Sequence, residues 1–255
     1  MKYWLLVAAC VASALGLLAA THLAPHVAHL GLFACYGLTG VAAVVTALSY
    51  TAHDRLRWAW LAFGIGYLVA FGSKVFIGDG FTITQMSPAR MVAWSIVVTV
   101  FNVALVTAFA LFARAWDGTG VAPAWRGRAT VIFFVIAFAV DAKSLLAGGR
   151  AMIGGQPWAF GFVASVVSDI AVLTLVGPIF ATAIALRGGL LMRPWLFLFV
   201  ASTCWLAVDV LAVLPLELRR DPDMIMRPLA VLFGGAAAIA QLLVKRDVRA
   251  SLADT

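Results

Sequence analysis

Eight long apolar stretches dominate the sequence, and only short connections separate them. A helix needs about 20 consecutive apolar residues to cross the hydrocarbon core of a bilayer, and each stretch has roughly that length. Each is bounded by charged residues, Pro or Gly. The stretches are Lys2–Ala20, Val27–Tyr50, Leu56–Ile77, Met91–Ala115, Arg128–Ala147, Trp158–Leu186, Arg193–Leu216 and Arg227–Val244. They predict an all-α integral membrane protein with eight transmembrane helices.

The composition excludes a soluble globular protein. Hydrophobic residues make up 64% of the 255-residue chain and charged residues only 11%, against roughly 45–50% and about 25% in an average soluble domain. Because so few charged side chains cannot cover the surface of a core this large, apolar side chains must face lipid. The longest connection, residues 116–127, leaves no room for a soluble domain. We therefore expect a single membrane domain over residues 1–255.

The distribution of Lys and Arg among the connections predicts the orientation, because cytoplasmic loops retain positive charge. One side carries eleven of these residues: Lys2, Arg55, Arg57, Arg114, Arg126, Arg128, Arg187, Arg193, Lys245, Arg246 and Arg249. The other side carries five: Arg90, Arg150, Arg219, Arg220 and Arg227. We expect a multi-pass protein of the cell inner (plasma) membrane with both termini in the cytoplasm. The net charge of +7 then indicates contact with anionic lipid headgroups rather than with nucleic acid.

The third and seventh predicted helices match each other when they are aligned at an offset of 135 residues. Trp60 then falls on Trp195, and Lys74 falls on Asp209. Each helix also follows an Arg-containing turn on the predicted cytoplasmic side. These matches predict an internal duplication with halves at about residues 1–116 and 127–248. Since each half holds four helices, the halves share one orientation and form a parallel repeat.

Ionisable residues within membrane-spanning helices are costly and are therefore candidates for function. Five are present: Lys74, Asp141, Lys143, Asp169 and Asp209. At a rise of about 1.5 Å per residue, Asp169 lies roughly 17 Å from the outer end of its helix, near the midplane, and Asn102 reaches a similar depth. Asp141 and Lys143 are two apart on one helix, so their side chains point to opposite sides. The sequence predicts a polar vestibule that opens outward above an apolar inner half.

Two interpretations stay open for the principal charges of this vestibule. Lys74 and Asp209 form a salt bridge across the two halves, or Lys74 snorkels to water without a partner. Asp169 takes part in a proton or cation relay, or it accepts an interhelical hydrogen bond. The nearby donors for that bond are Ser168, Thr174 and Asn102.

Trp94 and Trp205 lie deeper than the other tryptophans, which sit near predicted helix ends as an aromatic belt would. They form a ligand wall, or they pack and contact lipid. The segment Arg90-Met-Val-Ala-Trp94 resembles the Arg-x-x-Asp-Trp signature in the third helix of microbial rhodopsins, and the seven helices from the second onward share that topology. The resemblance implies an opsin-like bundle without retinal, because Ala93 stands at the counterion position and the last predicted helix, Arg227–Val244, has no lysine. We expect Arg90, Trp94 and Trp205 to line a ligand or ion pathway together with Asn102 and the five ionisable residues named above.

His22, His26 and His29 have a spacing that would place them on one face of a helix. Imidazoles so arranged could bind copper or zinc, or respond to pH. Pro25 interrupts the segment, however, and no carboxylate or thiolate stands nearby in the sequence. The alternative is a set of solvated histidines at the membrane surface. The sequence identifies no cofactor.

Three classes of function fit these features. The first is a carrier or channel for a small solute, with the charged vestibule as its coupling site. The second is a non-catalytic subunit that senses a ligand or assists assembly, within a homo-oligomer or with another membrane protein. The third is a lipid-modifying enzyme with Asp141, Asp169 and Asp209 as acids and bases. No motif of a familiar soluble enzyme is present, so we expect a carrier or channel rather than an enzyme.

Overall fold

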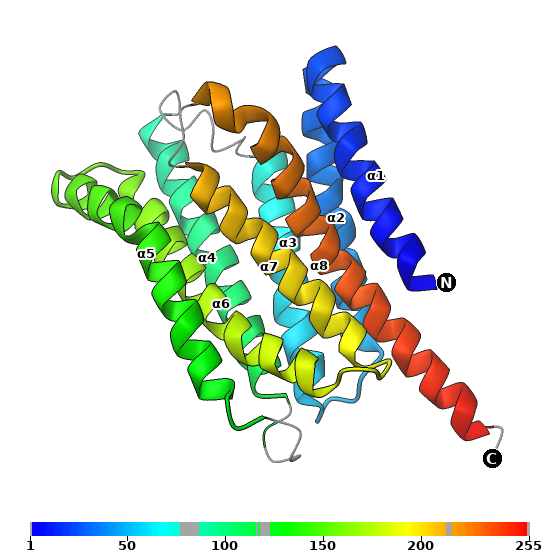
Figure 1. Ribbon diagram of the computed structural model, residues 1–255. Coiled ribbons are helices and arrows are strands. Elements are labelled where there is room, and N and C mark those ends of the chain that lie inside the picture. The colour runs from blue at the N-terminus through cyan, green and yellow to red at the C-terminus, as the bar shows by residue number, and fades with distance from the viewer. Residues whose placement is uncertain (1, 77–86, 116, 118–122, 213–215, 254–255) are drawn as a thin grey trace.

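The computed structural model describes residues 2–76, 87–115, 117, 123–212 and 216–253, which form an all-α bundle (Figure 1). The helices are α1 (Lys2–Leu23), α2 (Pro25–Leu48), α3 (Arg55–Phe76), α4 (Pro88–Ala113), α5 (Arg126–Ile153), α6 (Ala159–Ala185), α7 (Met192–Ala212) and α8 (Leu216–Ala253). Within these ranges, eight helices are long and apolar enough to cross a membrane, which confirms that prediction. Some side chains used to predict the orientation lie outside the described part: Lys2, Arg219, Arg220 and Arg249.

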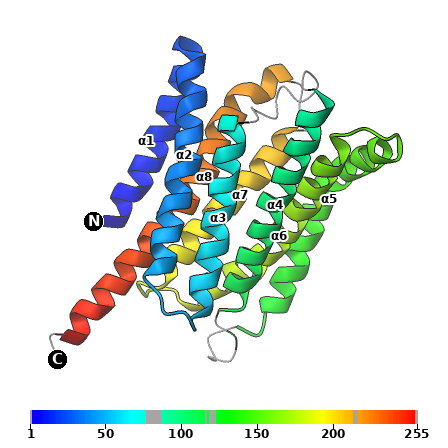
Figure 2. The same ribbon diagram turned by 180° about the vertical axis from the view of Figure 1, so that it is seen from behind.

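Six of the described helices form a closed ring. α2 packs against α3, α3 against α4, α4 against α6, α6 against α7, α7 against α8, and α8 returns to α2. Outside the ring, α1 packs against α2 and α8, and α5 packs chiefly against α6 (Figures 1 and 2). Because consecutive helices run in opposite directions, α3 and α7 end where α4 and α8 begin. We name this the Lys74 end of the bundle and the opposite one the Trp60 end.

The last helix is longer than the sequence predicts. We expect it to begin at Arg227, whereas α8 begins at Leu216 and contains Pro222 and Pro228. A proline inside a helix removes a backbone hydrogen bond and bends the helix. Figure 1 shows the first turns of α8 lying across the Lys74 end before the helix descends. These turns are polar and do not have to span the membrane, so a search for apolar stretches misses them.

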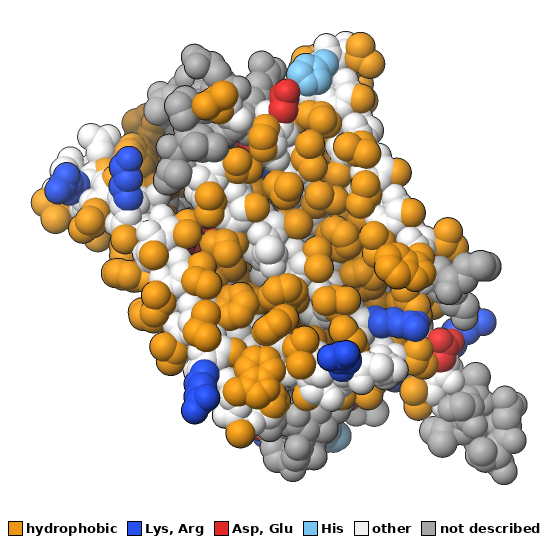
Figure 3. Space-filling view, viewed as in Figure 1, with side chains coloured by type: hydrophobic (Ala, Val, Ile, Leu, Met, Phe, Trp, Pro, Cys, Tyr) orange, Lys and Arg blue, Asp and Glu red, His pale blue; other side chains and the backbone are white. Residues whose placement is uncertain are grey.

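Apolar side chains cover the outside of the bundle between its two ends. Figure 3 shows hydrophobic side chains across the middle of one face, with charged side chains mainly towards its ends. The peripheral helices contribute to this surface, since Leu15 of α1 and Val131 and Ile132 of α5 are more than half exposed. So large an apolar surface would drive association in water. In a multi-pass membrane protein these side chains contact the lipid of the bilayer.

Small and hydroxylated residues allow the helices of the ring to approach closely. A methyl group added at Gly40 of α2 would lie 3.1 Å from the carbonyl oxygen of Gly64 on α3. Thr39 of α2 donates a hydrogen bond of 2.9 Å to the carbonyl oxygen of Val231 on α8. Such contacts are typical of helix packing in lipid, where close approach and hydrogen bonds take the place of a hydrophobic driving force.

Gly177 gives a test of this packing. A methyl group at this position of α6 would lie 2.7 Å from the carbonyl oxygen of Ala129 on α5, which is backbone and cannot swing aside. We expect Gly177→Val to destabilise the protein by about 2–3 kcal/mol, because overpacking forces the two helices apart. Thermal unfolding in detergent measures the loss. The control is Gly149→Val on α5, where nothing lies within 4 Å of the added carbon; equal melting temperatures for the two variants would contradict the packing described.

Candidate functional site

A cavity of about 580 Å³ lies inside the ring, and all six helices of the ring line it. Ligand pockets in proteins typically have about 300–1,000 Å³, so the volume suits a small organic molecule. At the Lys74 end the cavity is lined by Lys74, Trp94 and Arg227. Towards the Trp60 end it is lined by Phe63 and Phe109, which we name its floor.

Two aspartates stand in the cavity wall on neighbouring helices. Asp169 lies on α6, which begins at Ala159, so this carboxyl group is about 15 Å along the helix at 1.5 Å per residue. Asp209 lies in the last turn of α7. Both side chains are half-buried, line the cavity and interact electrostatically with each other. Two negative charges inside membrane-spanning helices require a compensating cation or proton.

Two basic side chains bring positive charge to the same cavity. The Arg227 guanidinium forms a salt bridge with Asp223, one turn earlier on α8, with Nη2 3.1 Å from both carboxylate oxygens. Its Cζ lies 6.0 Å from the centre of the Trp205 ring. The Lys74 Nζ lies 5.0 Å from the centre of the Tyr36 ring on α2, within the range of a cation–π interaction. Both cations thus have acidic or aromatic neighbours at the Lys74 end.

Asp141 lies on α5, outside the ring and behind this wall. Its side chain is buried, and its Oδ2 has no hydrogen-bond partner among the described residues. It interacts electrostatically with Asp169 and Asp209. Helices α5, α6 and α7 therefore gather three carboxyl groups in one region, two of them facing the cavity.

Aromatic side chains make up much of the remaining wall. They are Tyr36, Phe63, Tyr67, Trp94, Phe101, Phe109, Trp158, Phe162 and Trp205. An aromatic ring carries partial negative charge on its faces, so such a wall accepts both apolar groups and organic cations. Neutral polar groups are also present in the wall, from Asn102, Ser165 and Ser202.

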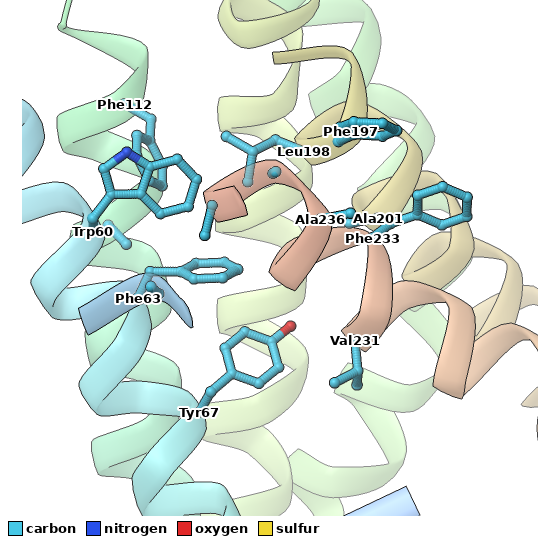
Figure 4. Packing of buried hydrophobic residues seen from close by; sticks show 14 of the residues in the cluster. Trp60, Phe63, Tyr67, Phe112, Phe197, Leu198, Ala201, Val231, Phe233 and Ala236 are labelled. Carbon is cyan, nitrogen blue, oxygen red and sulfur yellow. The ribbon is translucent and has the colours of Figure 1, made fainter. Parts of the chain in front are cut away.

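A cluster of five aromatic residues closes the cavity towards the Trp60 end. We name it the aromatic plug; its members are Trp60, Phe63, Phe109, Phe112 and Trp195, all buried. The ring centres of Trp60 and Phe112 are 4.6 Å apart and those of Phe112 and Trp195 are 6.0 Å apart, both edge to face. Figure 4 shows Trp60, Phe63 and Phe112 packed together, with Tyr67 beyond Phe63. The Trp60 Nε1 has no hydrogen-bond partner within the described part of the chain.

The structure brings most of the residues predicted for a ligand or ion pathway to the cavity. Those that line it are Lys74, Trp94, Asn102, Asp169, Trp205 and Asp209. Arg90 and Lys143 are exposed and are not among the described residues that line it. Two donors considered for Asp169 bond within their own helices instead: Asn102 Nδ2 to the Val98 carbonyl oxygen (2.9 Å) and Thr174 Oγ1 to that of Ile170 (2.7 Å).

The three histidines lie away from the cavity lining. The Nε2 of His22 is 3.5 Å from a carboxylate oxygen of Asp221 at the start of α8, and both side chains are more than half exposed. The ring centre of His29 lies 6.5 Å from that of Phe33. In the described part of the chain, no three His, Cys, Asp or Glu side chains gather as metal ligands would.

Several cavity residues are absent from the sequence prediction. Arg227 is the most important of them, because the sequence predicts it as the first residue of the last helix, whereas it lies three turns into the longer α8 and in the cavity wall. The spacing of Asp223 and Arg227, four residues apart, is typical of an ion pair on a helix and could have indicated this. Tyr67 and Trp158 carry no distinguishing pattern in a chain with 12% aromatic residues.

Comparison with known proteins gives no family to assign. No protein-family model matches the chain, and no curated protein or solved structure matches it either.

Proposed function

We propose that the protein is a carrier that moves a small organic solute across the cell inner (plasma) membrane. The observation that supports this most is the central cavity, which has carboxyl groups in its wall and a floor closed by the aromatic plug. A secondary transporter needs a binding site near the middle of the membrane that faces one side at a time. A cavity whose floor is part of the aromatic plug has the form of one such state.

Asp169 and Asp209 are the groups that we expect to couple transport to protons. Both line the cavity, and each can exist with or without a proton, which a neutral amide cannot. When the sites of the solute and the proton interact, binding of each changes the affinity of the protein for the other by the same factor. Exchange of protons at these two carboxyl groups would let a proton gradient drive the solute.

A repeated architecture supports a movement that opens the plug. The pairing of α2, α3 and α4 is repeated by α6, α7 and α8, and the contact of α4 with α6 is matched by that of α8 with α2. Trp60 and Trp195, at matching positions of the two halves, both pack edge to face on Phe112. We infer that residues 1–116 and 127–248 form a parallel repeat, and that rocking of one half against the other opens the Trp60 end.

The proposed orientation puts the Trp60 end and both termini in the cytoplasm, because most Lys and Arg of the connections belong to that end. A single cysteine at His53, which is exposed at the Trp60 end, is expected to react with an impermeant maleimide only after the membrane is permeabilised. A single cysteine at Gln156, exposed at the Lys74 end, is expected to react in intact cells. The background for both carries Ala at Cys10, Cys35 and Cys204. The reverse pattern would contradict the orientation.

The test of transport uses purified protein in liposomes and an isotopically labelled extract of small metabolites. We expect at least one solute to accumulate inside under an imposed pH gradient, and to leave when the gradient is reversed. Empty liposomes and liposomes without a gradient are the controls, with the contents identified by mass spectrometry. If no solute accumulates beyond the empty liposomes under either gradient, the carrier proposal is wrong.

A ligand-sensing subunit is the second candidate, and the closed aromatic floor supports it, since a fixed pocket also buries its ligand. Such a protein would bind a solute from the same extract without moving it. Retention of a solute by the protein, in amounts no greater than one per chain and independent of the gradient, would indicate this function instead.

A further inference from the structure

We propose that the cavity binds an organic cation with an apolar body, held between the carboxyl groups of Asp169 and Asp209 and the surrounding aromatic rings. The inference concerns the chemical class of the ligand. It rests on the proposed function only for the claim that this cation is also transported.

Among the residues that the structure describes, the balance of charge around the cavity is acidic. Among the described residues of this region, four carboxyl groups and two basic groups interact with one another or line the cavity: Asp141, Asp169, Asp209, Asp223, Lys74 and Arg227. With all four carboxyl groups ionised, four negative and two positive charges leave an excess of two negative charges. Because uncompensated charge is costly inside a membrane, the site favours a ligand that brings positive charge.

The two basic groups already have negative or aromatic neighbours. Arg227 is bound by both carboxylate oxygens of Asp223, and Lys74 lies over the ring of Tyr36. Asp169 and Asp209 line the cavity and share the electrostatic interaction with Arg227, which Asp223 already binds. One shared guanidinium cannot compensate two carboxylates and Asp223 as well, so an anionic ligand would meet excess negative charge, whereas a cationic ligand would reduce it.

The rest of the wall selects an organic cation over a metal ion. Metal cations such as Na⁺ and Ca²⁺ are hard ions and require several oxygen ligands at short range. A cavity of about 580 Å³ with nine Tyr, Phe and Trp residues in its wall instead offers aromatic and apolar surface. Trp94, Trp158 and Trp205 supply the ring type that binds cations best. A flat or branched amine or quaternary ammonium ion fits both the charge and the surface.

Binding of the cation also explains how the solute is exchanged for protons. When no cation is bound, protons on the carboxyl groups compensate the excess negative charge, and a bound cation replaces them. The groups that face Asp169 and Asp209 from the packed helices are Asp141 on α5, Asp223 and Arg227 on α8, with Lys74 on α3 lining the same cavity. No bond other than O–H is broken or formed, and the released proton passes to solvent.

Tetraphenylphosphonium and tetraphenylborate form a matched pair of probes, because they have nearly the same size and apolar surface but opposite charge. We expect tetraphenylphosphonium to bind saturably, one per chain, to the full-length protein in nanodiscs, beyond its partition into empty nanodiscs. Calorimetry in buffers of different ionisation enthalpy should show proton release on binding. Saturable binding of tetraphenylborate with equal or higher affinity, or no saturable binding of tetraphenylphosphonium, would overturn the inference.

Variants locate the binding site. Asp169→Asn and Asp209→Asn are each expected to weaken tetraphenylphosphonium binding by about tenfold or more, the usual scale for loss of a charge partner at a desolvated site. Asp221→Asn removes the same charge from an exposed position at the same end, and we expect it to bind as the wild type does. If all three variants bind equally, the cation is not held by these carboxyl groups. The comparison of the two probes on the wild type stands even if one variant fails to fold.

The outcome for this inference is separable from the outcome for transport. Saturable, Asp169-dependent cation binding without any flux would support the ligand class and refute the carrier. Accumulation of a neutral or anionic metabolite, without tetraphenylphosphonium binding, would support the carrier and refute the cation.

Discussion

Asp169→Asn is expected to lower solute accumulation driven by a pH gradient by about a hundredfold, which corresponds to about 3 kcal/mol at the upper end for a lost charged hydrogen-bond partner. The amide has nearly the same shape as the carboxyl group but can neither release a proton nor pair with a cation. Asp169 lines the cavity at the depth of the middle of α6. Initial uptake rates in liposomes with equal amounts of protein measure the effect.

Two controls separate this chemistry from packing. Asp169→Glu keeps the carboxyl group and is expected to retain a measurable part of the uptake, with a displaced pH profile. Asp221→Asn changes an exposed carboxylate outside the cavity lining and is expected to leave the uptake unchanged. Uptake by Asp169→Asn at the wild-type rate would show that this residue does not couple the proton to the solute.

Trp60→Ala is expected to have the largest effect on stability, a loss of about 3 kcal/mol, because a void replaces a fully buried indole. Trp60 is 1% exposed and packs on Phe63 and Phe112, with ring centres 5.8 and 4.6 Å away. The same change shortens the aromatic plug, so the cavity should also leak protons in the absence of solute. Thermal unfolding in detergent and the decay of a pH gradient in liposomes measure the two effects.

Trp58→Ala is the matched control for the plug. Trp58 lies on the same helix at the same end of the bundle, but it is 52% exposed and its Nε1 donates a hydrogen bond to the Ala52 carbonyl oxygen in the preceding turn. We expect this variant to lose less than about 1 kcal/mol, the scale of one net hydrogen bond, and to hold a pH gradient as the wild type does. Equal loss and equal leak in both variants would contradict the role given to the plug.

The sequence predicts the spanning helices well because the bilayer imposes their length and composition. Each apolar stretch has a counterpart among α1 to α8. A segment of about 20 apolar residues is stable in the bilayer only as a helix that satisfies its own backbone hydrogen bonds. The beginning of α8 is the exception. Its polar turns, from Leu216 to Arg227, lie at the end of the bundle, and no apolar pattern marks them.

The polar part of the cavity was predictable for a related reason. Asp169 and Asp209 are conspicuous inside apolar helices, because burying an ionisable side chain in the membrane costs free energy and such residues usually have a function. The sequence cannot say which side of a helix faces the centre, and for this reason Arg90 and Lys143 are expected along the pathway yet lie exposed. The side of a helix that faces the centre depends on which helices pack against it, and not on the types of its residues.

The aromatic part of the cavity could not be predicted. Phe63 and Phe109 form the floor only because α3 and α4 lie side by side, and the sequence contains many similar phenylalanines that face lipid, such as Phe134 and Phe138. The matching positions of Trp60 and Trp195 were visible as a repeat, but their common contact with Phe112 depends on how the two halves pack.

A carrier requires that the cavity open to each side of the membrane in turn, and one cysteine tests this without knowledge of the solute. Ser202 is buried and lines the cavity, so Ser202→Cys, with Cys10, Cys35 and Cys204 replaced by Ala, puts a thiol at the proposed binding site. An impermeant thiol reagent is added to one side of oriented liposomes under each direction of a pH gradient. We predict labelling from both sides, with the favoured side changing with the gradient. Labelling from the Lys74 end alone under every condition would indicate a fixed pocket and contradict the carrier.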